Sequence, residues 1–219
     1  TALLVSVGIP RDLTEKDIEQ IGRGLNTGAR EYGAYVLGGD TNEASDLVIS
    51  CAAFGVCEKN RLTLRRGAKP DDIVAVTGLF GKTSAGLKIL LKRFTAPSQL
   101  KKTLVNSVLM PQARLKEGLA LAKTDAVTAS IDSSDGLAWS LHEISKASKV
   151  GFLIDNLPVA EEAKKFAELH SLDPTQLCLY GGEEYELVLT IKPELWKKAE
   201  TAAHLIKIGS VTREKTLLF

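Results

Sequence analysis

The stretch that decides how this chain folds is "TASIDSSDGLAWSL", residues 128–141. An apolar run ends in the polar residues 132–135, a glycine follows, and apolar residues then recur at helical spacing. The run "DAVTASI" predicts a strand, and one face of a following helix is predicted by Leu137, Leu141, Ile144 and Ala147. The stretch is therefore a joint between a strand and a helix, and it carries two carboxylates and two hydroxyls.

Strand-like and helix-like segments alternate along the whole chain, which predicts the α/β or α+β class. Strands are expected at residues 2–10, 34–41, 46–58, 72–78, 125–131, 150–157, 185–191 and 205–212. Helices are expected at residues 13–33, 82–94, 98–122, 137–148, 159–172 and 193–203. Thr14 is the expected N-cap of the first of them. The basic segment "KNRLTLRRGAKPDD", which contains Gly and Pro, predicts a linker. We therefore expect a first domain at residues 1–66 and a second at 67–219.

The composition bounds the function. The 219 residues include 28 basic and 27 acidic side chains, a balance that favours neither a nucleic-acid partner nor a membrane surface. No apolar run reaches the roughly 18 residues that a membrane span needs. Cys51, Cys57 and Cys178 are an odd number without metal-type spacing, which predicts reduced core residues in a cytoplasmic protein.

The first acidic motif is "LGGDT", residues 37–41. Two glycines allow the backbone to approach a ligand closely, and Asp40 would follow them at the end of a short strand. A carboxylate so placed could hold Mg²⁺ against phosphate oxygens. The alternative is a tight turn in which Asp40 accepts hydrogen bonds from its own backbone.

The second motif is the joint itself. Ser134 or Asp135 could cap the helix that begins near Leu137, because Ser and Asp are preferred capping residues. One cap needs one such residue, whereas this joint has four. Asp132 and Asp135 would place two negative charges close together, an arrangement that a bound cation stabilises, and a helix N-terminus suits a phosphate. Metal plus phosphate is the interpretation we favour.

The third motif, "YGGEEYELVLT" at residues 180–190, repeats the Gly-Gly-acid pattern ahead of a strand. Alternation along that strand places Glu184 and Glu186 on one face, where a solvated edge would explain them. Glu183 follows the glycines directly, and a solvated edge explains it less well.

Two basic features accompany these acids. Arg65 and Arg66 precede a glycine in "LRRGAKPDD", where a guanidinium could reach a phosphate. "TGLFGKTSAG" has too short a spacing for a phosphate loop, so we interpret Gly81 to Ser84 as a helix start. The three histidines fall in helical segments without ligand spacing and are expected to be structural or surface residues. The sequence therefore predicts chemistry that relies on carboxylate side chains and a bound metal ion.

Taken together, the motifs resemble the thiamine-monophosphate kinase family, which belongs to the superfamily of aminoimidazole ribonucleotide synthetase. The resemblance rests on "LGGDTNE", "LRRGAKPDDIVAVTGLFG", "SIDSSDGLAWSLHEIS" and "YGGEEYELVLT", in the family's order and across nearly the whole chain. It implies the two-domain fold of that superfamily, with the N-terminal domain incomplete in this chain. It also implies transfer of the γ-phosphoryl group of ATP to thiamine monophosphate, with Mg²⁺, giving thiamine diphosphate in thiamine biosynthesis.

By the same resemblance, Gly39, Asp40, Arg65 and Ser134 would bind ATP. Mg²⁺ would be held by Asp40, Asp132 and Asp135, and Glu183 would contact the thiamine substrate. Transfer between two anionic phosphates needs positioning and charge neutralisation, so no nucleophilic side chain is expected. A homodimer formed through the N-terminal domains is also implied.

The chain departs from the family at two points. Glu184 stands where the family has Asp, and the family's aspartate-rich N-terminal segment has no counterpart before "TALLVSVGIP". We therefore expect the chain to be a piece of a longer protein. By itself, the chain is expected to lack part of the active site. One alternative is another ATP-dependent enzyme of the superfamily, either a ligase of purine synthesis or a selenophosphate synthetase. The other alternative is a catalytically silent nucleotide-binding fragment.

Overall fold

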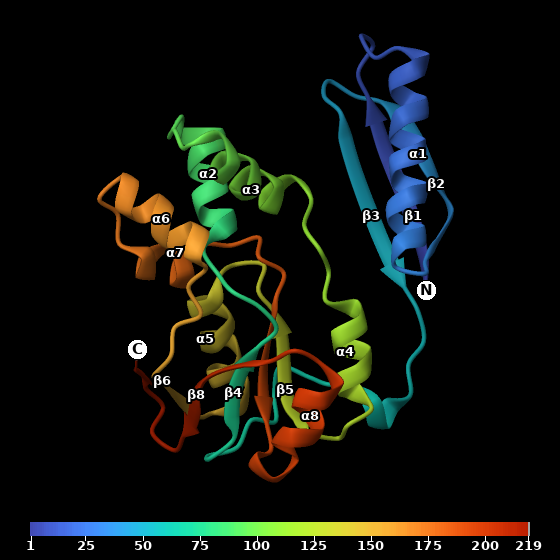
Figure 1. Ribbon diagram of the computed structural model, residues 1–219. Coiled ribbons are helices and arrows are strands. Elements are labelled where there is room, and N and C mark those ends of the chain that lie inside the picture. Colours follow the sequence, from blue (N-terminus) through green and yellow to red (C-terminus); the bar gives the residue numbers. More distant parts are fainter. Residues whose placement is uncertain (219) are drawn as a thin grey trace. The chain divides into compact units, whose positions relative to one another are not determined.

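The structure, a computed structural model, describes residues 1–218, apart from the side chain of Asn60. It divides into two compact units, Thr1–Asn60 and the remainder from Arg61 onward (Figure 1). Each unit has its own sheet, as a mixed α and β sequence predicts. Among the described residues, no helix is both long enough and apolar enough to cross a membrane.

The first unit is a three-stranded sheet with one helix, in the spatial order β2-β1-β3. Its elements are β1 (Ala2–Ile9), α1 (Glu15–Glu31), β2 (Tyr35–Glu43) and β3 (Val48–Phe54). β1 pairs parallel with β2 across the α1 connection and antiparallel with β3. α1 begins at the predicted cap, where Thr14 and Asp17 exchange side-chain to backbone hydrogen bonds of 2.9 and 3.3 Å.

The Gly-Gly-Asp motif of this unit lies inside a strand, so the alternative of a tight turn is wrong, although Asp40 does accept a backbone hydrogen bond, from the Thr41 N–H. Gly38, Gly39 and Asp40 are part of β2, which continues to Glu43. A Cβ atom on Gly39 would lie 1.6 Å from the carbonyl oxygen of Val5 on the neighbouring strand. The glycine is therefore required by the close approach of β1 and β2.

The cysteines correct a second expectation. Cys51 and Cys57 are exposed, because every residue of β2 and β3 is exposed in this thin unit, and β3 ends at Phe54 before Cys57. Cys178 is buried, and burial raises the pKa of its thiol to about 12. All three are free thiols, but only Cys178 is a core residue.

The second unit is built on a six-stranded sheet in the order β5-β7-β4-β8-β6-β9. The strands are β4 (Ile73–Val76), β5 (Val127–Asp132), β6 (Gly151–Ile154), β7 (Leu187–Ile191), β8 (Ile206–Thr212) and β9 (Leu217–Leu218). All pairs are antiparallel except β6 with β9. The class is therefore α+β, one of the two that the sequence predicts.

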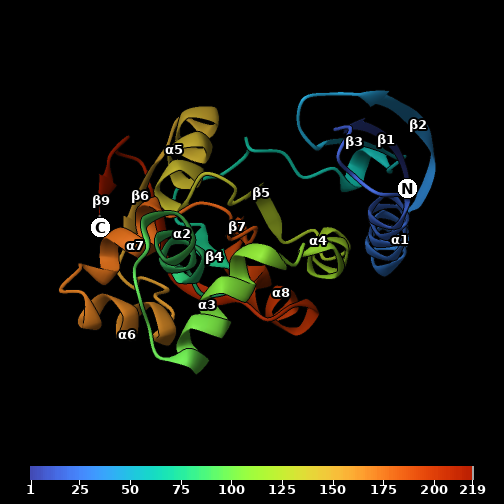
Figure 2. The ribbon, with the colours of Figure 1, turned by 90° about the horizontal axis from the view of Figure 1, so that it is seen from above.

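Helices cover both faces of this sheet (Figure 2). Val74 and Val76 of β4 pack in one buried cluster with α5 (Leu137–Ser148). Ala75, between them, packs on the opposite face in a cluster with residues of α4 (Leu115–Ala122) and α8 (Trp196–Ala202). Successive side chains of β4 therefore point to opposite faces of the sheet, and both faces are buried. This explains why β4 is a short run of apolar residues only.

The remaining helices form a third cluster beside the sheet. They are α2 (Lys82–Lys92), α3 (Ser98–Leu109), α6 (Glu161–Leu169) and α7 (Pro174–Tyr180); the two 3₁₀ turns are η1 (Lys59–Arg61) and η2 (Pro193–Leu195). The single helix expected at 98–122 is wrong. It is broken between Leu109 and Leu115, where Pro111 lacks the N–H that a continuous helix would need. α7 is not among the helices that the sequence predicts.

The packing of α2 against α3 yields a stability prediction. A Cβ atom on Gly86 would lie 2.2 Å from the carbonyl oxygen of Leu104, which is backbone and cannot move aside alone. We expect Gly86→Ala to lower the free energy of unfolding by about 1–3 kcal/mol, the usual cost of overpacking.

The matched control is Gly118→Ala in α4, where the new Cβ would lie 3.5 Å from Leu187 Cδ1, an ordinary contact. Alanine favours a helix over glycine by roughly 0.5–1 kcal/mol, so this variant should be neutral or more stable. Urea unfolding measures both, and equal losses in the two variants would contradict the packing argument.

Candidate functional site

The joint between β5 and α5 leaves its carboxylates free of any capping role. Asp132 is the last residue of β5, and both Asp132 and Asp135 are exposed. The N-cap of α5 is Gly136, with φ 100°, and no side chain caps the helix. The alternative that Ser134 or Asp135 caps this helix is therefore wrong. The carboxylates lie beside a helix N-terminus that no side chain caps.

The loop before β7 packs directly on this joint, backbone against backbone. The N–H groups of Glu183 and Tyr185 donate to the carbonyl oxygens of Ser134 and Ser133, at 2.8 and 3.1 Å. A Cβ atom on Gly182 would lie 2.5 Å from the Ser134 oxygen, so the second glycine of the motif is what lets the two loops meet. The second and third acidic motifs therefore form one site, which we call the joint site: residues 132–136 and 181–185.

Glu183 and Tyr185 hold an unusual backbone within the joint site. Both are non-glycine residues with positive φ, 67° and 53°. The Tyr185 hydroxyl donates a hydrogen bond of 2.5 Å to Glu183 Oε2. This bond raises the pKa of Tyr185 to about 12, and burial and the negative charges of Glu183, Asp132 and Asp135 act in the same direction. Glu183 is thus exposed and oriented by a hydrogen bond, and its N–H group donates to Ser134, the residue before Asp135.

Glu184 caps a helix and does not lie at a solvated edge. Its Oε1 accepts hydrogen bonds from the N–H groups of Gly81 and Thr83, at 2.6 and 3.3 Å, at the start of α2. The helix start predicted at Gly81 is confirmed, and a carboxylate distant in sequence supplies its cap. Burial raises the pKa of Glu184, and these hydrogen bonds oppose that shift.

Glu186 is buried, so a solvated edge is wrong for this residue as well. Arg114 Nη2 and Nε donate to its two carboxylate oxygens, at 2.6 and 2.7 Å, and the Thr77 hydroxyl donates to Oε2 at 2.7 Å. Glu186 is 6% exposed. The hydrogen bond to Glu186 raises the pKa of Arg114, and burial opposes this. Glu184 and Glu186 line the same polar pocket, but β7 begins only at Leu187, so the alternation expected along a strand does not reach either residue.

The other predicted residues lie outside the joint site. Arg65 has a mostly exposed side chain, whose nearest carboxylate partner is Glu143 Oε2 of α5, at 3.8 Å. Asp40 belongs to the first unit, where it accepts hydrogen bonds from the Thr41 N–H at 2.9 Å and the Asn42 amide at 2.6 Å. Each is exposed and available to a ligand. The joint site itself gathers Asp132, Ser134, Asp135 and Glu183.

The donor set of the joint site fits a hard cation shared with phosphate. Within residues 1–218, no group of three or more His, Cys, Asp or Glu side chains forms a site that could hold a metal ion by itself. Mg²⁺ usually takes only one or two carboxylates and completes its shell with water and phosphate oxygens. Asp132 and Asp135 offer such oxygens, and Ser134 Oγ lies 3.3 Å from Asp135 Oδ2.

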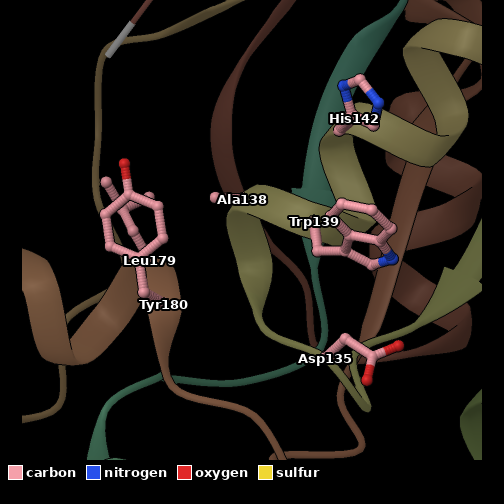
Figure 3. A pocket seen from close by; sticks show the side chains of 6 residues that line it. All are labelled: Asp135, Ala138, Trp139, His142, Leu179 and Tyr180. Atoms are coloured by element: carbon pink, nitrogen blue, oxygen red, sulfur yellow. The ribbon is translucent and has the colours of Figure 1, made fainter.

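A pocket of about 630 Å³ opens beside the joint site, and of its lining residues only Asp135 was a predicted site residue (Figure 3). Its lining comes from the start of α5 and the end of α7: Asp135, Ala138, Trp139, His142, Leu179 and Tyr180. Trp139 lies off the apolar face of α5, which is the one signal that could have marked it. Of the histidines, His170 packs on Phe94 and Phe166 as a structural residue, whereas His142 lines this pocket.

Comparison with known proteins places the chain in a family. Residues 1–57 match the family model described as "AIR synthase related protein, N-terminal domain", and residues 69–217 match its C-terminal domain. The thiamine-monophosphate kinase of Pyrococcus horikoshii is 39% identical over 195 residues. That of Nitrosopumilus maritimus is 33% identical over 220 residues. A solved structure of AaThiL complexed with AMPPCP and TMP superposes with a TM-score of 0.84 at 26% identity.

The chain covers only part of each of these proteins. The Pyrococcus alignment takes in 88% of the chain and 59% of its relative, and the Nitrosopumilus alignment 98% and 69%. The AaThiL superposition takes in all of the chain and 69% of that structure. The chain therefore spans about three fifths to two thirds of the length of its relatives. The matches over both units show that it belongs to the AIR synthase related family and, within it, to the thiamine-monophosphate kinases.

Proposed function

We propose that the protein to which this chain belongs transfers the γ-phosphoryl group of ATP to the phosphate of thiamine monophosphate, in a Mg²⁺-dependent reaction. The observation that carries the proposal is the joint site, where Asp132, Asp135 and Glu183 meet at the N-terminus of α5. Relatives named thiamine-monophosphate kinase, and a similar structure that holds an ATP analogue with TMP, support it.

Each site residue would have a role that follows from its position. Asp132, Asp135 and Ser134 present oxygens where the phosphates of both substrates would meet, and the N–H groups at the start of α5 face the same loop. Bound Mg²⁺ would neutralise phosphate charge there. Glu183 would contact the thiamine substrate, held in place by the Tyr185 hydroxyl. Arg65, Gly39 and Asp40 would bind ATP, with Asp40 also available to Mg²⁺.

Catalysis would then be electrostatic. Both reacting phosphates are anionic, so their approach needs cations and oriented donors more than a nucleophilic side chain. The acceptor is a phosphate oxygen, which is already ionised at neutral pH and needs no general base. No side chain of the joint site is therefore assigned a proton-transfer role.

We also propose that the protein is a homodimer through residues 1–66, the nucleotide-binding and dimerisation region. Apolar side chains that are at least 38% exposed occur on all three strands of the first unit: Leu4, Val36, Leu37, Val48, Ile49 and Phe54. A sheet with so much exposed apolar surface is typical of an interaction surface, and a second copy would cover it. Free, exposed Cys51 and Cys57 fit the reducing cytoplasm.

The direct test is thiamine diphosphate formation from thiamine monophosphate, ATP and Mg²⁺ by the full-length protein, compared with its Asp135→Asn variant. Loss of a carboxylate that faces two phosphates should lower turnover by roughly 10²-fold or more without unfolding the protein. Asp125→Asn is the matched control: Asp125 is an exposed aspartate just before β5, and asparagine accepts its φ of 58°. Equal turnover in all three proteins would contradict the site.

Tyr185→Phe tests the orientation of Glu183. The change removes only the hydroxyl that donates to Glu183 Oε2, so the carboxylate loses its orientation while the loop stays in place. We expect KM for thiamine monophosphate to rise about tenfold, which corresponds to ~1.4 kcal/mol, while KM for ATP stays unchanged. Steady-state kinetics measures both constants.

The double variant completes the test. If Tyr185 acts through Glu183, Tyr185→Phe should add little to the effect of Glu183→Gln, because the oriented group is already altered. Fully additive effects would show that the hydroxyl acts on its own and would remove the positioning role.

The dimer proposal is tested by Phe54→Glu, which places a charge on a β3 side chain that is 51% exposed. Burying that charge in an interface is costly, so the variant should sediment as a monomer at concentrations where the parent is a dimer. Leu91→Glu on α2, at a residue 75% exposed in the second unit, is the control and should leave the dimer intact. A dimeric Phe54→Glu variant would mean that another surface pairs.

A further inference from the structure

The pocket beside the joint site is larger than the phosphate chemistry needs. Its volume of about 630 Å³ falls within the roughly 300–1,000 Å³ usual for small-molecule sites. Figure 3 shows Leu179 and Tyr180 on one side, and Trp139 with Asp135 on the other. Of its lining residues, only Asp135 belongs to the joint site, so the pocket continues that site away from the phosphates.

Two aromatic side chains are left exposed at this pocket. Trp139 is 53% exposed and Tyr180 is 64% exposed, while Leu179, next to Tyr180, is buried. A single exposed apolar residue is ordinary, but two large aromatic rings that line one pocket from two different helices are typical of a binding site. The His142 ring lies against Trp139, with centroids 5.5 Å apart and planes at 33°, which limits the motion of the indole.

The charge around the pocket selects the kind of ring that would bind. Asp135 lines it, Asp132 lies in the same joint at the end of β5, and the Glu183 N–H donates a hydrogen bond of 2.8 Å to the carbonyl oxygen of Ser134, next to Asp135. Of the lining residues, only His142 can carry a positive charge. An aromatic face next to several carboxylates favours a flat cation, which the face of the ring attracts through a cation–π contact.

We propose that Trp139 and Tyr180 form the subsite for the thiazolium ring of the substrate, with Trp139 as its main aromatic contact. The inference rests on the proposed function. The thiazolium nitrogen carries no hydrogen, so it cannot donate a hydrogen bond to a carboxylate, and an aromatic face is the group that recognises it. Because only a two-carbon arm joins the ring to the phosphate, a phosphate at Asp132 and Asp135 places the ring near Trp139.

Kinetics on the full-length protein gives the first test. Trp139→Ala should raise KM for thiamine monophosphate about tenfold and leave KM for ATP unchanged, and Trp139→Phe, which keeps an aromatic face, should lie between. For a substrate analogue with a neutral thiophene ring in place of the thiazolium, the difference between wild type and Trp139→Ala should vanish. An unchanged KM in Trp139→Ala, with wild type active, would overturn the subsite and leave the proposed function standing.

Fluorescence separates the subsite from the reaction. The chain has two tryptophans, and Trp196 of α8 is partly buried and packs against the core cluster on the other face of the sheet. Thiamine monophosphate should quench emission in Trp196→Phe, which keeps Trp139, and this quenching should be absent in Trp139→Phe. AMP should not quench, because the pocket is assigned to the cationic ring and not to adenine.

The outcomes distinguish the two proposals. Quenching of Trp139 by thiamine monophosphate without product formation would support the subsite and count against the kinase activity. Quenching by AMP in place of thiamine monophosphate would overturn the subsite. If thiamine monophosphate neither binds nor reacts, both proposals fail together.

Discussion

The pairing of β5 with β7 is the constraint on which the rest of the second unit depends. The two strands are antiparallel, with Asp132 opposite Leu187, so the end of one lies beside the beginning of the other although more than 50 residues separate them. Antiparallel register fixes which loops meet, because a slip of one residue would turn every side chain to the opposite face. The joint site exists because the loop after β5 and the loop before β7 are held together by this register.

Three glutamates in four residues then serve three different purposes, and their surroundings decide which. Glu183 is exposed and oriented by a phenol, Glu184 caps a helix, and Glu186 is buried against an arginine. A buried ion pair is weak evidence for stability, because desolvation offsets the attraction, but it fixes geometry strongly. Arg114 links the connection between α3 and α4 to Glu186, directly before β7, so the same ion pair holds the fold and the loop of the joint site.

Local signals in the sequence predicted the elements well and the long-range contacts poorly. The Thr14 cap, the helix start at Gly81 and the strand-to-helix joint follow from nearby residues, and the structure has all three. The solvated edge expected for Glu186 is wrong because its partner, Arg114, lies 72 residues away, where no periodic pattern reports a contact. The burial expected for Cys51 is wrong because strand propensity does not say whether anything covers the strand. The pocket at Trp139 forms only where two helices come together, and no local pattern in the sequence predicts that contact.

The order of the strands has a consequence for how this unit forms. β8, at Ile206–Thr212, lies between β4 and β6 in the sheet, so β6, at Gly151–Ile154, has no neighbour on that side until β8 has been made. Such non-local pairing requires long loops to close, with a loss of chain entropy, before the stabilising contacts form, and this slows folding. In the meantime the strand edges stay open to other chains. During synthesis, the unit would therefore stay an incomplete sheet until its last strands leave the ribosome, and that interval is when aggregation competes with folding.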